Sequence, residues 1–153
     1  MALNADQLAA GISIAHSCFT QGRLKDAEIL LEGLITLQAD NPYLHMLLGS
    51  VLLQQGRLDE SVDSFNRAIE ISPENISALT NRGEIHLKQG RLKEAAEDLK
   101  RAASLDTKEE DPFANRARLL IEMTSSLLKV AEEKGMTAVE NARQQILLQL
   151  KQN

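Results

Sequence analysis

The chain has 153 residues, of which 43% are hydrophobic and 25% are charged, as is ordinary for a soluble globular protein. Its formal net charge of −5 argues against nucleic acid as a partner, because phosphate binding requires a basic surface. The single cysteine, Cys18, excludes an intramolecular disulfide framework, and the acidic N-terminus and lack of a long apolar run predict a cytoplasmic chain without membrane insertion.

Helical signals begin at the N-terminus. Asn4 and Gln7 have the spacing of a capping box, so we expect the first helix to begin near Asn4. A second helix is expected after Gly22. Asn41 followed by Pro42 predicts the start of a third, since Asn caps helices and Pro fits the first helical position.

A repeated turn organises the first two thirds of the chain. Its copies lie 34 residues apart and read Gly22-Arg23-Leu24, Gly56-Arg57-Leu58 and Gly90-Arg91-Leu92. Glycine gives the sharp turn because it tolerates a left-handed backbone at a helix C-terminus. A fixed period of this length predicts a solenoid of helix-turn-helix repeats, at about residues 8–41, 42–75 and 76–109.

The period stops after the third repeat. Asp111-Pro112 predicts a helix over about residues 112–134, and the capping-box spacing of Thr137 and Glu140 predicts a last helix over about 137–152. The first of these is expected to cover the apolar end of the solenoid. The last is expected to pack on that cap or to contact a second copy of the chain. We treat residues 1–153 as a single domain.

Small residues recur at equivalent positions of repeats two and three: Gly49, Ser61 and Ala68, then Gly83, Ala95 and Ala102. This pattern resembles the tetratricopeptide repeat (TPR) family over about residues 8–109. No repeat has the aromatic that often opens the motif, since Gly11, His45 and Leu79 stand there. Repeat one departs furthest from the pattern, because Leu34 also replaces a small residue. The resemblance implies an all-α, right-handed TPR superhelix of three helix-turn-helix repeats with C-terminal capping helices and a concave groove.

A looser resemblance concerns the layout of the whole chain. Three such repeats, a short N-terminal lead and a C-terminal cap in one small acidic protein are similar to the class II chaperones of bacterial type III secretion. Turns such as Gly22-Arg23-Leu24-Lys25-Asp26-Ala27 are similar as well. Those chaperones hold hydrophobic translocator subunits in the cytoplasm, so the resemblance implies a protein partner.

The groove of TPR folds is lined by one stripe of each repeat's first helix. Carried onto this chain, the resemblance implies a peptide-binding groove lined by Ile12, His16, Phe19, Tyr43, Met46, Ser50, Leu53, Thr80, Glu84 and Leu87. The first two repeats contribute mostly apolar side chains, which commonly mark a binding surface, and the third is more polar. We predict that the groove holds an extended or helical peptide by apolar anchors.

Two alternatives stay open for this groove. Phe19 and Leu53 lie near helix ends and could belong to the core instead. The chain's own N-terminus or last helix could also fill the groove.

No pattern of catalytic residues is found. The three histidines, His16, His45 and His86, fall at different positions of different repeats, so no metal site is expected. Cys18 fits a buried core position better than a nucleophile. No nucleophile pairing or glycine-rich phosphate loop is present, which predicts a non-enzymatic protein with no cofactor.

The charged residues are expected to be structural or solvated. The recurring arginines, Arg23, Arg57 and Arg91, are expected to pair with nearby carboxylates. Glu94, Glu97 and Asp98 have the spacing of a solvated helix face.

We therefore predict a protein-binding chaperone or adaptor. The alternative is a structural scaffold or a homodimer that associates through Ile146 and Leu150 of the last helix.

Overall fold

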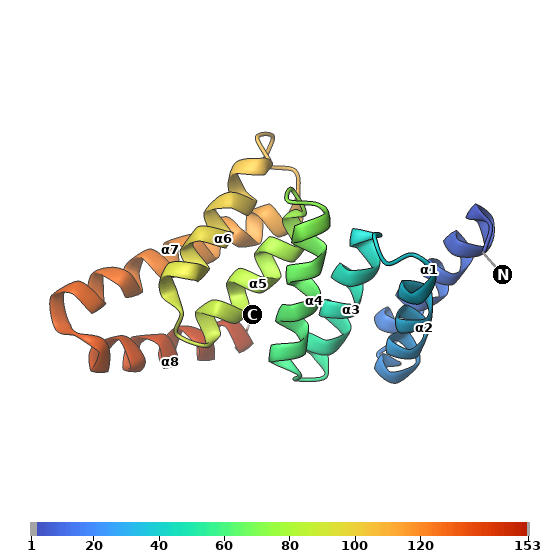
Figure 1. Ribbon diagram of the computed structural model, residues 1–153. Helices are drawn as coiled ribbons and strands as arrows, with labels where there is room; N and C mark the ends of the chain where they lie inside the picture. Colours follow the sequence, from blue (N-terminus) through green and yellow to red (C-terminus); the bar gives the residue numbers. More distant parts are fainter. Residues whose placement is uncertain (1–2, 153) are drawn as a thin grey trace. The chain divides into compact units, whose positions relative to one another are not determined.

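The computed structural model describes residues 3–152, and the regular elements of these residues are all α-helices (Figure 1). In chain order they are α1 (Ala5–Thr20), α2 (Leu24–Leu37), α3 (Pro42–Gln54), α4 (Leu58–Ile71), α5 (Ile76–Lys88), α6 (Leu92–Leu105), α7 (Pro112–Lys134) and α8 (Met136–Gln152). The predicted all-α fold with three helix-turn-helix pairs and two further helices is confirmed.

The helices form two compact units, and the boundary between them along the chain falls in the first turn of α5. The first unit ends at Ala78 and the second begins at Leu79. Each is described by itself below. The prediction that residues 1–153 form one domain stays a prediction, and Met1, Ala2 and Asn153 lie outside the described residues.

The three repeated turns have the backbone that their glycines predict. Gly22, Gly56 and Gly90 adopt φ values of +74°, +78° and +76°, a region that residues with a Cβ rarely adopt. The next residue then closes the helix end, as where the Arg23 amide donates to the Cys18 carbonyl at 2.8 Å.

The helix starts follow the sequence with one exception. Asn4 and Gln7 form the expected capping box, and the Asn41 side chain accepts a hydrogen bond from the Tyr43 amide at 3.1 Å. The last helix, however, begins at Met136, so Thr137 lies inside it and is not its cap. The positive φ of Gly135 makes the turn between α7 and α8 one residue tighter than expected.

The core of the first unit depends on close approach of paired helices. A Cβ on Gly49 of α3 would lie 2.7 Å from the Phe65 ring of α4, and Phe65 is fully buried. Ser61, which also lies on α4, donates a hydrogen bond from Oγ to the Gly49 carbonyl at 2.7 Å. Small residues at these positions therefore let a large ring fill the space between the two helices.

At another pair of positions, repeat one exchanges the sizes that repeats two and three have on their first and second helices. Leu34 of α2 is buried where the other repeats have alanine, and Gly11 of α1 faces it. A Cβ on Gly11 would lie 2.9 Å from Leu34 Cδ2. The two departures of repeat one from the TPR pattern are thus one compensating pair.

The second unit repeats this packing and adds the two C-terminal helices. A Cβ on Gly83 of α5 would lie 2.8 Å from Leu99 Cγ of α6. Helix α7 packs on α6 and turns back into α8 (Figure 1). Five residues of α7 are buried (Ala114, Ala117, Leu120, Thr124 and Leu127), whereas in α8 the buried residue is Val139.

Asp98 is not part of a solvated face, and that expectation was wrong. Only 6% of Asp98 is exposed, and both its carboxylate oxygens accept hydrogen bonds from Arg82 of α5, at 2.7 and 2.6 Å. His86 Nε2 lies 3.7 Å from the same carboxylate. The charge is buried because a bidentate guanidinium accompanies it. Glu94 and Glu97 are exposed as expected.

The arginines of the first two turns pair with carboxylates, as predicted. Arg23 binds the exposed Asp26 at 2.7 Å. Arg57 binds Glu60 at 2.5 Å and also reaches back to Glu28 of α2 at 2.5 Å. In the third turn, Arg91 donates to the amide oxygen of Gln89. The Arg57–Glu28 contact therefore ties one repeat to the next.

Acid should weaken the first unit through Glu28. Hydrogen bonds from Gln55 and Arg57 outweigh the effect of burial and lower the pKa of Glu28 from 4.5 to about 2. Because the folded pKa is the lower one, the stabilisation is present above pH 4.5 and is lost as the pH falls toward 2. We expect a loss of about 1–3 kcal/mol, measured by urea denaturation across this range. Glu28→Gln should show a flatter pH profile, and an unchanged slope would contradict this assignment.

Candidate functional site

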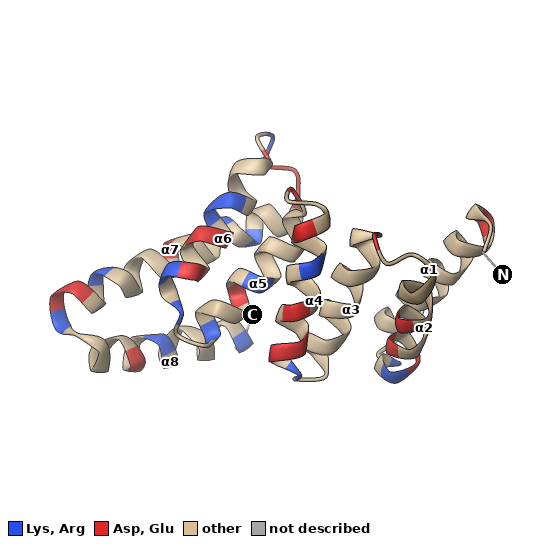
Figure 2. Ribbon diagram, viewed as in Figure 1, with Lys and Arg blue, Asp and Glu red and all other residues tan. Residues whose placement is uncertain are grey.

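The first helices of the first two repeats are almost free of charge. Asp6 is the one Asp, Glu, Lys or Arg in α1, and α3 has none (Figure 2). Their partner helices α2 and α4 carry most of the charges of this unit, among them Lys25, Glu28 and Glu60. Charge is thus segregated by helix, in a chain that is 25% charged.

Seven of the predicted groove residues lie on these two helices, α1 and α3, which contact each other. His16 is exposed, and Tyr43 is 38% exposed. The other five are half-buried: Ile12, Phe19, Met46, Ser50 and Leu53. The structure therefore leaves surface on every one of the seven, most of it apolar.

Individual contacts show how these side chains are held. Phe19 packs against the core cluster of the first unit and also lies beside His16, with ring centroids 6.4 Å apart. Phe19 thus has a core contact as well as partial exposure. Ser50 Oγ donates to the Met46 carbonyl at 3.1 Å. Partial burial raises the pKa of the Tyr43 hydroxyl.

The three predicted groove residues of the second unit are placed differently. Thr80 and Leu87 of α5 are fully buried, and Thr80 Oγ1 donates to the Phe113 carbonyl of α7 at 3.1 Å. Neither side chain lines an open groove in this structure, because both are fully buried. A role for either in binding stays a prediction.

Glu84 is buried and is paired with two partly exposed cations. Arg116 of α7 donates to both its carboxylate oxygens, at 2.8 and 3.0 Å, and Lys88 lies 3.0 Å from one of them. Burial opposes ionisation of Glu84, but the hydrogen bond from Arg116 and the charge of Lys88 outweigh it and lower the pKa. The carboxylate is therefore already satisfied within the chain.

The last helix lies against this part of α5. A hollow of about 460 Å³ is bounded on one side by the Glu84, Lys88 and Arg116 cluster. Its other lining residues come from α8: Gln144, Leu147, Leu148, Leu150 and Lys151. In the second unit, the arrangement corresponds to the alternative in which the last helix fills the predicted groove.

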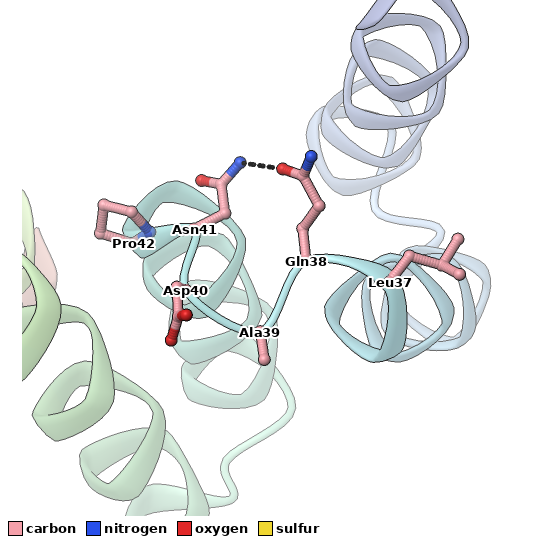
Figure 3. Close-up of a pocket in the computed structure, with 6 residues that line it drawn as sticks. All are labelled: Leu37, Gln38, Ala39, Asp40, Asn41 and Pro42. Atoms are coloured by element: carbon pink, nitrogen blue, oxygen red, sulfur yellow. Dashed lines mark hydrogen bonds between the residues drawn. The ribbon is translucent and has the colours of Figure 1, made fainter. Parts of the chain in front are cut away.

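A second hollow, of about 580 Å³, lies elsewhere and carries no argument for binding. It is formed by the connector between α2 and α3, residues 37–42 (Figure 3). Asn41 Nδ2 donates to Gln38 Oε1 at 3.5 Å across it. These residues make and cap the turn, so we assign no site there.

The described residues contain neither a metal-binding cluster nor a membrane-spanning helix. No cluster of His, Cys, Asp and Glu among residues 3–152 has a metal-binding arrangement. In the same range, no helix combines the length and the apolar character that crossing a bilayer requires.

Arg116 and Arg143 were missed at the level of sequence. Arg143 of α8 donates to the Lys88 carbonyl, 55 residues away, and to Glu140 within its own helix. The Glu140–Arg143 spacing is visible in the sequence but is common on exposed helix faces. No sequence signal links either arginine to α5.

Two family models match the middle of the chain. Residues 49–90 match the family model of the TPR repeat, and residues 76–108 match that of the tetratricopeptide repeat. No curated protein gives a significant sequence match.

Solved structures share the fold at low sequence identity. The type III secretion translocator chaperone SycD of Yersinia enterocolitica has a TM-score of 0.77 and 19% identity, over 83% of this chain and 89% of that one. PcrH of Pseudomonas aeruginosa in complex with the chaperone binding region of PopD gives 0.74 and 20%, over 81% and 95%. The first TPR of Spaghetti bound to an HSP90 peptide gives 0.74 and 17%, over 84% and 98%.

Proposed function

Since the chain carries tetratricopeptide repeats, we propose that it is a non-enzymatic protein-binding module that holds an apolar partner segment on α1 and α3. The observation that carries this proposal is the near-absence of charge on these two helices, beside partly exposed Ile12, Phe19, Tyr43 and Met46. Apolar surface of this kind is stabilised when a partner removes it from water. Tyr43 and Met46 add a hydrogen-bonding tip and an adaptable side chain.

The finer form of the proposal is a cytoplasmic chaperone or adaptor of the type III secretion kind. Its support is the fold shared with SycD, a translocator chaperone, and with PcrH in complex with the chaperone binding region of PopD. The partner would then be a hydrophobic polypeptide kept from aggregating before export. The uncharged face suits such a segment better than an acidic or phosphorylated one.

The test is affinity capture from the source cell's lysate with the native chain and with Tyr43→Ala plus Met46→Glu. We expect the double variant to lose at least about tenfold in bound partner, because a buried charge and a lost aromatic anchor remove the main apolar contacts. Circular dichroism should show equal helix content for both proteins.

The matched control makes the same two kinds of change elsewhere in the first unit. Ile29 and Leu37 of α2 are 59% and 50% exposed, so Ile29→Ala plus Leu37→Glu alters exposed apolar surface outside α1 and α3. This control should capture the partner as the native chain does. Equal capture by all three proteins would falsify binding by α1 and α3.

A scaffold that self-associates is the second candidate. The observation that favours it is the exposed apolar surface of α8, where Met136 and Leu148 are 66% and 59% exposed. Ile146→Asp plus Leu150→Asp should then lower the mass measured by light scattering. A monomeric native chain at all concentrations would exclude this candidate.

A further inference from the structure

A hydrogen bond from Arg143 joins helix α8 to the C-terminal end of α5. Arg143 Nη1 donates to the Lys88 carbonyl, at the C-terminal end of α5, where a cation also complements the helix dipole. The two oxygens of Glu140 hold Arg143 Nη2 in place, each at 2.6 Å. A Cβ on Gly90 would lie 3.4 Å from Arg143 Nη1, so the guanidinium rests on the turn itself.

The apolar contact between α8 and α5 leaves part of its side chains exposed and a hollow between the helices. Of the α8 residues toward α5, Leu147 and Leu150 are only half-buried and Leu148 is largely exposed. The hollow of about 460 Å³ remains between them and the Glu84 cluster. Arg143 Nε is buried without a hydrogen-bond partner, which offsets part of the stabilisation from Nη1.

Helix α8 buries fewer side chains than α7. Helix α7 buries five side chains, whereas α8 buries Val139, close to its start. Segments with few buried apolar contacts open at lower free energy than the rest of a fold. The C-terminal half of α8 can therefore leave α5 while α5, α6 and α7 stay packed.

We propose that the face of α5 and α7 around Glu84, Lys88 and Arg116 is a docking surface for an amphipathic helix, occupied in the free chain by α8. A partner helix of the same chemistry, with leucines along one side and a cation near the α5 C-terminus, competes with α8 for it. The proposal deepens the proposed function and rests on it, because it adds a displaceable segment to a partner-binding chain.

The first experiment is hydrogen exchange on the full-length chain. Amides of residues 136–152 should exchange faster than those of residues 112–127. Arg143→Gln should speed exchange in 136–152 and in 84–90 by about tenfold, the factor expected for loss of one charge-assisted hydrogen bond. Exchange in residues 112–127 should not change.

The second experiment supplies the occupant in trans. A fluorescent synthetic peptide of residues 136–152 is titrated into the full-length chain and followed by anisotropy. We expect it to bind Arg143→Gln about tenfold more tightly than the native chain, because the variant's own α8 competes less. Glu140→Gln, which loosens Arg143 without removing it, should give a smaller shift in the same direction.

The control is Lys134→Gln, the same charge change at an exposed residue at the end of α7. It should leave both exchange and peptide binding as in the native chain. Faster exchange of α8 without peptide binding, or no change in exchange at all, would overturn the proposal and make α8 a permanent part of the cap. Neither readout involves Tyr43 or Met46, so failure here is distinguishable from failure of binding by α1 and α3.

Discussion

Phe65→Ala should lower the free energy of unfolding of the first unit by about 3–5 kcal/mol, the range for removing a large, fully buried aromatic side chain. Phe65 fills the space above Gly49, which has no side chain of its own to take that place. Urea denaturation followed by circular dichroism measures the change. A loss of less than about 1 kcal/mol would mean that α3 and α4 close over the gap.

A double-mutant cycle tests whether the contact itself is responsible. Gly49→Ala alone should destabilise by about 1–3 kcal/mol, because its Cβ would meet the Phe65 ring at 2.7 Å. In the Phe65→Ala background the same change should be close to neutral. The coupling energy should therefore be at least about 1 kcal/mol, whereas strict additivity would contradict the contact.

Removing one partner of the buried Arg82–Asp98 pair should have the second large effect. Arg82→Met leaves the Asp98 carboxylate, with 8% of its side chain exposed, without its bidentate partner. We expect a loss of about 3–5 kcal/mol in the second unit, since an uncompensated buried charge is strongly destabilising. Thermal and urea denaturation of the full-length chain measure it.

The control replaces both members of the pair. Arg82→Met with Asp98→Leu removes the charge together with its partner, so most of the stability should return. If the double variant is as unstable as Arg82→Met, the loss reflects packing and not the stranded charge. The exposed pair Arg23–Asp26 gives the reference, because breaking it should change stability by less than about 1 kcal/mol.

The fold could be predicted because its signals are local. A positive φ at Gly22, Gly56 and Gly90 is a property of single residues, and the 34-residue spacing then fixes where each helix pair begins. The caps at Asn4 and Asn41 are equally local, since each bonds an amide two or three residues away.

The errors arose where a contact joins distant residues. Asp98 has the sequence spacing of a solvated face, and its guanidinium partner is on another helix, 16 residues upstream. Helical spacing also does not show that Thr80 and Leu87 are buried, and their role in binding stays a prediction. The contact of α8 with α5 includes a hydrogen bond from Arg143 to the Lys88 carbonyl, 55 residues away. Helical periodicity contains no information on such contacts.

The lack of charge on the first helices of the first unit is visible in the sequence, whereas the contacts of the third repeat are not. Residues such as Tyr43 and Met46 lie on helices whose lack of charged residues is evident from the amino-acid sequence. In the third repeat, Glu84 and Lys88 look available on α5, and only the structure shows Arg116 and α8 beside them.

The exchanged sizes of Gly11 and Leu34 affect how this chain can be engineered. Stabilising a repeat by moving each position toward its family's commonest residue assumes that positions contribute separately. Here a bulky residue at position 11 would collide with Leu34, and alanine at position 34 alone would open a void against Gly11. The two residues are therefore coupled, and repeat one can reach the common TPR pattern only when both are substituted together.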